Sequence, residues 1–389
     1  DYNIGTIYYY SKFNKTGYEK ILNKYKKIKN KLKSENSEFK YDIIETKFNL
    51  SHFKIVNKKL YVSEQEDNSL IINTHSAFKE AYLHMAYEDG LNFITGEIIK
   101  KSFIERYVKA NPNIRKYDDM NFYPNPDKCP DNHYNLWRDF EVKKIINYDE
   151  DLNGLNFILN HIKILCNHQN DVYEYILDFL AHMFQRPEEK PGIFILFISA
   201  QGTGKGLLFD LLRYMLGNDL VLETPCPERD VWGSFNNQMM SSYLVNIEEL
   251  SFLSSKGSEG IFKNYITQSK MIINPKGKDT INITSYHRFI GSTNLDSGDI
   301  PIKTVNGDRR NLLIKCSDET KGNVKYFNEL IKLINSKNLQ ATFYKFLMDR
   351  KNTDLFKQKS IPITEYQSDI KEAFECIVLS FIKNDIIYF

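Results

Sequence analysis

The sequence predicts an α/β fold with a parallel sheet in its core, a mostly helical domain before the core and a helical segment after it. A continuous apolar run at 193–198 is typical of a strand buried on both faces of a parallel sheet. A glycine-rich turn and an amphipathic helix that ends at Gly217 follow this run directly. Further short apolar runs alternate with helical or loop material, which favours an α/β sheet. The predicted core strands are 193–198, 220–222, 243–247, 289–291 and 312–314.

Bulk composition bounds the class of protein. The chain has 389 residues, more than one hydrophobic core usually holds, so we expect several domains. Hydrophobic residues make up 42% of it, including 26 Phe and 25 Tyr, which excludes a mainly disordered chain. The 5 cysteines form no CxxC pair, so they favour neither a disulfide framework nor a zinc site and indicate a reducing, intracellular compartment. The run at 193–198 is far shorter than the roughly 20 residues that cross a bilayer, so no membrane partner is expected.

Changes of pattern divide the chain into four predicted segments. These are a basic N-terminal or linker segment at 1–75, a mostly helical domain at 76–190, the core at 191–317 and a helical C-terminal segment, expected to be truncated, at 318–389. Within the first segment, 12–33 is rich in Lys and contains a single acid, Glu19, which predicts a basic amphipathic helix. We favour a solvated helix face there over a nucleic-acid or membrane contact. The following stretch, 41–63, is expected to contain short strands.

The turn after the first core strand carries the strongest chemical signal. Small residues at such a turn let backbone N–H groups converge on phosphate oxygens at a helix N-terminus, and Lys205 would bridge the β- and γ-phosphates. The turn departs from the usual P-loop at Ser199, which replaces the first glycine, and at Gly206, where a Ser or Thr hydroxyl normally meets Mg²⁺. A plain glycine-rich turn is the alternative, and the flanking strand and helix argue against it. The predicted phosphate-binding residues are Gly202, Thr203, Gly204, Lys205 and Gly206.

Acidic and amide side chains follow two later strands of the predicted core. The strand at 243–247 ends in Glu248 and Glu249, the shape of a Walker B motif. We expect Glu248 to help hold Mg²⁺ and Glu249 to polarise the attacking water. Exposed acids at a strand end are the alternative, and the nearby P-loop favours the catalytic interpretation. Another strand leads to Asn294, whose amide could orient the hydrolytic water beside the γ-phosphate.

Two basic features complete the series of motifs. Arg309 and Arg310 precede the last core strand, and one of them could act as a finger on the γ-phosphate of a neighbouring subunit. A structural Arg–Asp pair is the alternative for either one. Residues 271–283 predict a β-hairpin with Lys276 and Lys278 at its tip. Such lysines can track a phosphate backbone, although an exposed polar turn is the commoner explanation.

The order of these motifs, GTGKG, VNIEEL, the hairpin, GSTN and DRR, resembles that of the superfamily 3 helicases, in particular the primase-helicases of poxviruses, other large DNA viruses and plasmids. The resemblance covers about residues 190–317, and 134–140 is similar to the helical domain that these proteins carry before the motor. It implies an AAA+-like P-loop core that uses ATP and Mg²⁺. It also implies a homo-hexamer that translocates on single-stranded or forked DNA at a site of viral replication, with a fused or associated primase.

The resemblance also assigns roles that single motifs leave open. Asn294 would be the sensor, Lys276 and Lys278 would grip single-stranded DNA in the channel of the ring, and Arg309 or Arg310 would be the finger supplied in trans. Two other functions remain as alternatives. One is an enzyme like the nucleoside monophosphate kinases, which usually place the turn near the N-terminus and use an Arg-rich lid. The other is a ring scaffold that binds DNA without hydrolysing ATP, which Gly206 motivates.

Overall fold

The computed structural model describes residues 40–66, 69–92, 94–234, 236–248, 256–275, 280–294, 309–351 and 353–369. The chain divides into two compact units, Asp1–Asp119 and Met120–Phe389. The division falls inside 76–190, where the sequence predicts one mostly helical domain. The predicted basic helix within 12–33 lies outside the described residues. No helix in the described ranges is both long enough and apolar enough to span a membrane.

The first unit combines a small sheet with helices. Its four-stranded sheet has the order β3-β2-β1-β6, in which β1 pairs antiparallel with β2 and parallel with β6. Its core is a cluster of rings that includes Phe48, Tyr61, Phe78 and Phe103. The elements of this unit are α3 (Tyr41–Ser51), β1 (His52–Ile55), β2 (Leu60–Glu64), β3 (Leu70–Asn73), α4 (His75–Ala81), β4 (Ala86–Leu91), β5 (Ile98–Ser102), α5 (Phe103–Ala110) and β6 (Lys116–Tyr117).

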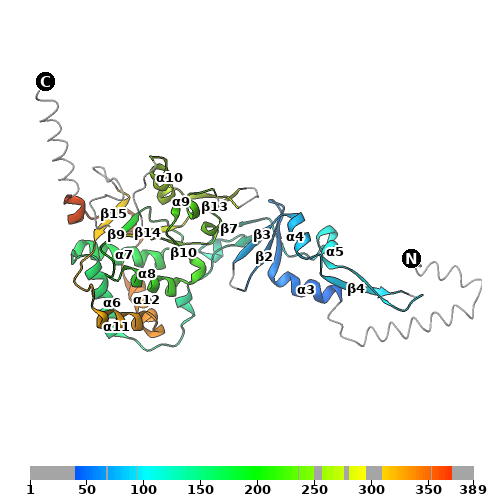
Figure 1. Ribbon diagram of the computed structural model, residues 1–389, viewed down its shortest axis with the longest axis horizontal. Coiled ribbons are helices and arrows are strands. Elements are labelled where there is room, and N and C mark those ends of the chain that lie inside the picture. Colours follow the sequence, from blue (N-terminus) through cyan, green and yellow to red (C-terminus); the bar gives the residue numbers. More distant parts are fainter. Residues whose placement is uncertain are drawn as a thin grey trace, which may run out of the picture. The chain divides into compact units, whose positions relative to one another are not determined.

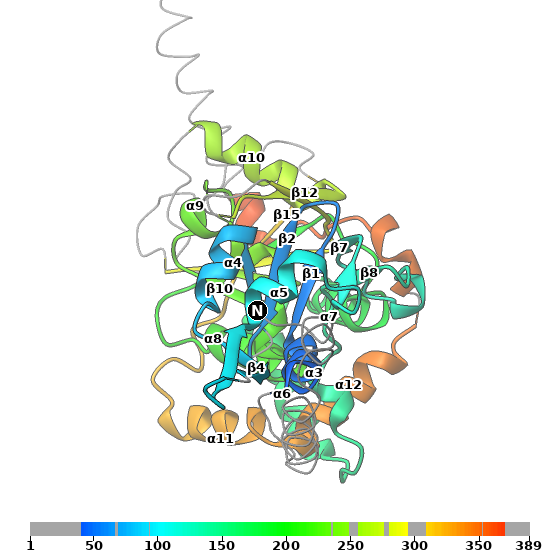
Figure 2. The same cartoon turned by 90° about the vertical axis from the view of Figure 1, so that its right-hand side faces the viewer.

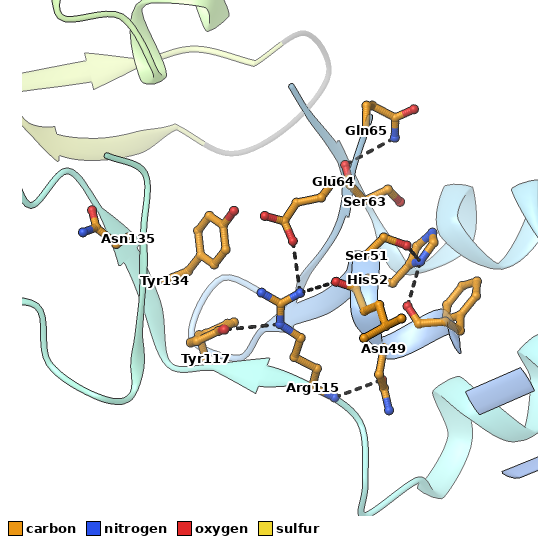
Figure 3. Close-up of polar contacts among 12 residues, drawn as sticks. Asn49, Ser51, His52, Ser63, Glu64, Gln65, Arg115, Tyr117, Tyr134 and Asn135 are labelled. Carbon is orange, nitrogen blue, oxygen red and sulfur yellow. Dashed lines mark hydrogen bonds and ion pairs between the residues drawn. The ribbon is translucent and has the colours of Figure 1, made fainter. Parts of the chain in front are cut away.

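The first element of this unit corrects the prediction of short strands over 41–63. Residues Tyr41–Ser51 form helix α3, which buries Tyr41, Glu45 and Phe48 at helical spacing, and only the residues after it form strands. Arg115 fastens the end of α3 to the sheet (Figure 3). Its guanidinium donates to the Leu50 carbonyl at 2.8 Å, to Glu64 at 3.0 Å and to the Tyr117 hydroxyl at 3.2 Å.

The second unit is built on a five-stranded sheet with the order β10-β11-β14-β9-β15, and each neighbouring pair is parallel. The prediction of an α/β core with a parallel sheet is therefore confirmed, as are its strands.

The elements from residue 119 onward are β7 (Asp119–Asn121), η1 (Pro126–Lys128), β8 (His133–Asn135), η2 (Glu141–Lys144), α6 (Leu152–Leu165), α7 (Asn170–Gln185), β9 (Phe194–Ile198), α8 (Lys205–Leu216), η3 (Asn218–Leu220), β10 (Val221–Thr224), α9 (Pro227–Asp230), η4 (Asn237–Met240), β11 (Leu244–Ile247), α10 (Lys256–Thr267), β12 (Lys270–Ile273), β13 (Ile281–Thr284), β14 (Arg288–Thr293), β15 (Asn311–Lys315), α11 (Val324–Ile334), α12 (Lys337–Asp349) and η5 (Thr353–Gln358).

Helices cover both faces of this sheet. On one face, Phe197 of β9 contacts Phe209 of α8, with ring centroids 5.9 Å apart. On the other face, Phe262 of α10 lies 5.0 Å from Phe194 of β9 and 5.7 Å from Phe289 of β14. Figures 1 and 2 show α10 on one side of the sheet and α6, α11 and α12 on the other. Because helices pack on both faces of the sheet, every residue of β9 is buried, as its continuous apolar run predicts.

The expected mostly helical domain at 76–190 is helical throughout only in its last part, α6 and α7. Earlier in this range the chain forms the ribbon of β4 and β5, which pair antiparallel. The residues of β5 are largely exposed, so no alternation of buried and exposed positions marks it as a strand in the sequence. The helical character of the C-terminal segment is confirmed where it is described, in α11 and α12.

A short linker between α7 and β9 is fixed from both sides. Arg288, at the start of β14, is fully buried, and its guanidinium donates to the carbonyls of Arg186 and Glu189 at 2.9 Å. Lys190, which belongs to the linker, donates to groups outside it: to the Ser285 hydroxyl at 2.6 Å and to two carbonyls near the end of α10. These contacts give both side chains oxygen partners and fix where β9 enters the sheet.

Candidate functional site

The predicted P-loop lies where β9 ends and α8 begins. Gly202 and Gly204 have φ angles of 86° and 91°, a left-handed conformation that side chains disfavour, and Gly204 is the N-cap of α8. The space around Gly204 is also filled. A Cβ placed there would lie 2.7 Å from Cε1 of His161 and 2.8 Å from Cε1 of Phe327. The glycine at this position is therefore required both by backbone conformation and by packing.

The side chain of Lys205 points toward the carboxyl ends of the central strands. Its Nζ donates to the Ser199 hydroxyl, to Oδ1 of Asn294 at 3.2 Å and to the Ala200 carbonyl at 3.4 Å. Burial lowers the pKa of Lys205 below its ordinary value, and nearby Cys316 and Asp318 act in the opposite direction. It also donates to the Ser199 carbonyl at 3.4 Å, and all four of these acceptors are uncharged oxygens. An anionic phosphate would be a stronger partner for this ammonium group than any of them.

Three strand ends contribute to the surroundings of Lys205. Ser199 follows β9, Asn294 follows β14 and Cys316 follows β15. Because parallel strands place their carboxyl ends at one edge of the sheet, these residues gather although they are far apart in the sequence. The structure therefore brings together two predicted site residues, Lys205 and Asn294. Thr203, also predicted, is buried and its hydroxyl lies 2.6 Å from that of Ser199, so it supports the turn from inside.

The acidic part of the predicted site lies at the same edge. Glu248 is exposed directly after β11, and its backbone N–H donates to the Thr224 carbonyl of β10 at 2.9 Å. Glu249 lies outside the described residues. Sequence reasoning missed Asn246, two residues before Glu248. Its side chain is 1% exposed, and both amide atoms are without a hydrogen-bond partner among the described residues. A polar residue inside an apolar run was the signal that could have found it.

The orientation of Asn246 follows from the strand register. It pairs with Ile290 of β14, which pairs with Ile195 of β9, so it shares a sheet face with Phe197 and helix α8. A buried amide that bonds nothing carries a desolvation penalty of about 1–3 kcal/mol. Such a group in a folded protein calls for an explanation, and a polar ligand or water beside α8 would supply the missing bonds.

These residues fit a nucleoside triphosphate with Mg²⁺. Lys205 and the glycine turn suit phosphate oxygens, while Glu248 and the amide oxygen of Asn246 are ligands of the type that Mg²⁺ or its water shell takes. Gly206 leaves open space, since nothing lies within 4 Å of a Cβ built there. In the described part of the chain, no group of three or more His, Cys, Asp or Glu residues could hold a metal by itself. The cation would therefore depend largely on phosphate oxygens and water, as Mg²⁺ usually does.

A buried histidine links the P-loop to the helices beside it. His161 of α6 is 1% exposed, and its Nε2 lies 3.2 Å from the Gly204 carbonyl. A carbonyl only accepts, so Nε2 carries the proton, and the other nitrogen accepts from the Tyr326 hydroxyl of α11 at 3.0 Å. Burial lowers the pKa of His161 to about 4, so the ring is neutral at pH 7. The position of the turn thus depends on α6 and α11, which the sequence did not indicate.

Arg309 and Arg310 lie at the other end of the strands, where β9 and β15 begin. The Arg310 carbonyl accepts from the backbone N–H of Phe194, the first residue of β9, at 2.7 Å. Strand β15 then runs parallel to β9 toward Lys205. The structure therefore does not bring either arginine to the Lys205 site of its own chain, and the role of a finger supplied to a neighbour stays a prediction.

The predicted hairpin is present, with β12 and β13 paired antiparallel, while Lys276 and Lys278 at its tip lie outside the described residues. Two asparagine side chains hold its two strands. Asn236 is fully buried, donates to the Ile272 carbonyl at 3.1 Å and accepts from the Asn274 N–H at 2.9 Å. Asn121 accepts from the backbone N–H of Thr284 at 2.7 Å. The two strands are therefore fixed to the unit independently of the tip.

A family model, a phage protein and solved structures match this chain. A family of unknown function, DUF5906, matches residues 197–310, from β9 to Arg310. The DNA primase-polymerase of Nitratiruptor phage NrS-1 is 26% identical over 210 residues, which are 53% of this chain and 28% of that protein. Two solved apo structures of the NrS-1 C-terminal region give TM-scores of 0.62 and 0.61 at 18% identity, and they cover 90% and 87% of this chain and 78% and 75% of their own.

This chain has the fold of the NrS-1 C-terminal region. The matched stretch spans little more than a quarter of the phage primase-polymerase, 28% of its length. The predicted similarity to a viral replication protein is confirmed at this level. Membership of superfamily 3 and an AAA+-like P-loop core stay predictions.

The two glycines that flank Lys205 should respond differently to substitution. Gly204→Ala combines a left-handed φ of 91° with contacts below 3 Å, so we expect it to destabilise the unit and to abolish nucleotide binding. Gly206→Ala meets nothing within 4 Å and lies inside helix α8, so we expect the free energy of unfolding to rise by about 0.5–1 kcal/mol. Urea unfolding and nucleotide titration of both variants measure this; equal behaviour would contradict the geometry of the turn.

The stability of the protein should fall in mild acid partly because of His161. Its pKa is about 4 in the folded state and about 6.5 when unfolded, so the unfolded chain binds the proton first. This contribution is complete above about pH 6.5 and is lost as the pH falls toward 4. When the pH falls from 6.5 to 5, we expect the unfolding free energy of the wild type to drop by about 1.5 kcal/mol more than that of His161→Gln. Urea unfolding of both proteins at several pH values measures this. If their unfolding free energies changed with pH by the same amount, the prediction would be wrong.

Proposed function

We propose that this chain is the ATP-dependent DNA helicase motor of a replication protein. In this proposal a homo-hexameric ring hydrolyses ATP between subunits, translocates on single-stranded DNA and unwinds duplex DNA. The observation that carries the proposal is the gathering of Lys205 and Asn294 at the end of β9 and β14, with Glu248 at the same edge. The similarity to the C-terminal region of a phage DNA primase-polymerase supports a role in replication.

The strand order supports an AAA+-like arrangement of the site. Strand β14 lies between β9, which leads to Lys205, and β11, which leads to Glu248. Neighbouring strands are about 4.8 Å apart, so the two site strands are separated by roughly 10 Å. That separation leaves room for a phosphate group, a hydrated cation and a water between the lysine and the carboxylate. Asn294 follows the strand in between and would face the attacking water.

Each site residue then has a defined task in hydrolysis. The N–H groups of the glycine turn and the start of α8 bind phosphate oxygens, and Lys205 exchanges its contacts with Ser199 and Asn294 for the β- and γ-phosphates. The Asn294 amide, once released, orients the water. Glu249 would polarise that water, and Glu248 would help to hold Mg²⁺ through its water shell. Bound Mg²⁺ neutralises charge on the phosphates.

Two functional alternatives differ from the motor in testable ways. A kinase of small nucleotides needs an acceptor site beside Lys205 and works without a ring. A scaffold that binds DNA without hydrolysis keeps the fold and lacks turnover. The location of Arg309 and Arg310, at the opposite sheet edge from Lys205, favours the ring because a second copy can then supply the arginine. A fused or associated primase is the proposed partner.

Replacing Lys205 tests the proposed hydrolysis directly. We expect the full chain to hydrolyse ATP faster with single-stranded DNA present, and Lys205→Ala to lower turnover by at least about a hundredfold, because a fixed cation at the phosphates is lost. Lys332→Ala, an exposed lysine of α11, is the matched control. Absence of ATP turnover in the wild type, with and without DNA and under conditions in which rings form, would rule out the motor.

The hairpin tip tests the proposed DNA contact separately. Lys276→Ala with Lys278→Ala should weaken binding of single-stranded DNA and lower the salt slope of the affinity by roughly 1–2, since about two phosphate contacts are lost. Basal ATP turnover should stay unchanged, because the strands are held by Asn236 and Asn121. Fluorescence anisotropy at several salt concentrations measures the slope. An unchanged slope would show that the tip does not contact DNA.

A further inference from the structure

Three groups form a continuous chain of hydrogen bonds that ends at the glycine turn. The Tyr326 hydroxyl of α11 donates to Nδ1 of His161 at 3.0 Å, and Nε2 of His161 donates to the Gly204 carbonyl at 3.2 Å. His161 is 1% exposed, and each nitrogen of its ring has a partner. The chain of bonds therefore joins α11 to the turn through one tautomer of the histidine.

The peptide group at the inner end of these bonds belongs to the start of α8. Gly204 is the N-cap of α8 and Lys205 is its first residue, so the Gly204 carbonyl and the Lys205 N–H lie on one peptide group. The carbonyl also accepts from the backbone N–H of Leu207 at 3.1 Å, so both of its lone pairs are used. N–H groups in the first turn of a helix have no partner inside the helix, and such groups bind phosphate. The Lys205 N–H is one of these donors.

Hydrogen bonds on the two sides of one peptide group strengthen each other. Donors on the carbonyl oxygen draw electron density toward it and make the N–H a better donor, an effect of about 10–30% per bond. His161 also limits rotation of this peptide, because Cε1 of its ring lies 2.7 Å from a Cβ built on Gly204. The histidine therefore influences both the direction and the donor strength of the Lys205 N–H.

Aromatic packing holds the outer end of the chain of bonds. The ring of Tyr326 stacks on Phe157 of α6, with centroids 4.9 Å apart, and lies 5.8 Å from the His161 ring. The backbone N–H of Tyr326 donates at 3.0 Å to the side chain of Asn323, the N-cap of α11. Tyr326 is thus part of the first turn of α11. Any strengthening of its bond to His161 acts on the beginning of that helix.

We propose that His161 and Tyr326 are positioning residues for a nucleotide at the P-loop, and that through them bound phosphate stabilises the start of α11. This inference rests on the phosphate binding of the proposed function, and it does not depend on hydrolysis. Linkage makes the effect reciprocal. If an ordered α11 strengthens phosphate binding through these bonds, bound phosphate stabilises α11 by the same factor.

Two substitutions at His161 separate the bond to Gly204 from general packing. Gln can place its amide N–H near the position of Nε2, whereas Asn, which is one bond shorter, reaches only the position of Nδ1. We expect His161→Asn to weaken binding of ADP with Mg²⁺ at least about threefold, and His161→Gln to stay within about twofold of the wild type. Isothermal titration calorimetry of the full chain measures both, and the Lys205→Ala variant identifies the P-loop contribution.

The control variants address folding and the chemistry of the substitution. His84→Asn makes the same change at an exposed histidine and should bind ADP like the wild type. The thermal unfolding midpoint of each variant shows whether it is folded at the temperature of the titration. A purely structural histidine would lower the midpoint in both His161 variants and leave their ADP affinities alike.

Hydrogen exchange of α11 tests the outer bond. ADP with Mg²⁺ should slow the exchange of Val324–Ile334 in the wild type. Tyr326→Phe keeps the ring and removes the hydroxyl, so at saturating ADP it should lose most of this protection. Helix α5, Phe103–Ala110, belongs to the first unit and is the internal reference.

The results that overturn this inference differ from those that overturn the motor. Equal ADP affinities of the two His161 variants, or full ADP-dependent protection of α11 in Tyr326→Phe, would show that the bonds serve only the fold. If neither His161 variant folds, Tyr326→Phe decides alone. A wild type that binds no ADP overturns both proposals. A wild type that shows the expected binding and protection but never hydrolyses ATP overturns the motor and supports the positioning role.

Discussion

The parallel register of β9 between β14 and β15 is the constraint on which the rest of this unit depends. Leu196 of β9 pairs with Gly291 on one side and with Leu313 on the other. This alignment brings Ser199 and Asn294 to the same edge, where both contact Lys205. A slip of one residue would turn every side chain of a strand to the opposite face. The chemistry of the site is therefore a consequence of strand pairing, and the turn alone could not produce it.

Arg288 secures this register at the other end of β14. A buried charge without partners would be destabilising by several kcal/mol, yet its guanidinium has the Arg186 and Glu189 carbonyls and lies 4.5 Å from the centre of the Tyr243 ring. These contacts join the end of α7, the linker and the first residue of β14. Because the linker leads straight into β9, the same cation helps to set where both strands begin. Burial of this arginine thus serves the pairing of the sheet.

The sequence predicted the sheet well because strands buried on both faces are continuous apolar runs, as in 193–198 and 243–247. It predicted α3 and β5 poorly, because α3 buries Glu45 and β5 is largely exposed, so neither shows a clear period. The glycine turn and Lys205 could be found from local pattern. His161 could not, since its contact with Gly204 joins two helices that are neighbours only in the folded chain.

The two ends of the parallel strands carry different groups: Lys205 lies at the carboxyl ends, and Arg309 and Arg310 lie at the amino ends. Strand β9, Phe194–Ile198, is 5 residues long and separates them by roughly 16 Å at about 3.3 Å per residue, so Arg309 and Arg310 lie away from the Lys205 site of their own chain. Under the proposed ring, the phosphate-binding edge of one copy meets the cationic edge of the next. Each copy would then supply the lysine to one nucleotide and the arginines to another. Such a division makes hydrolysis depend on assembly, because neither edge is a complete site alone.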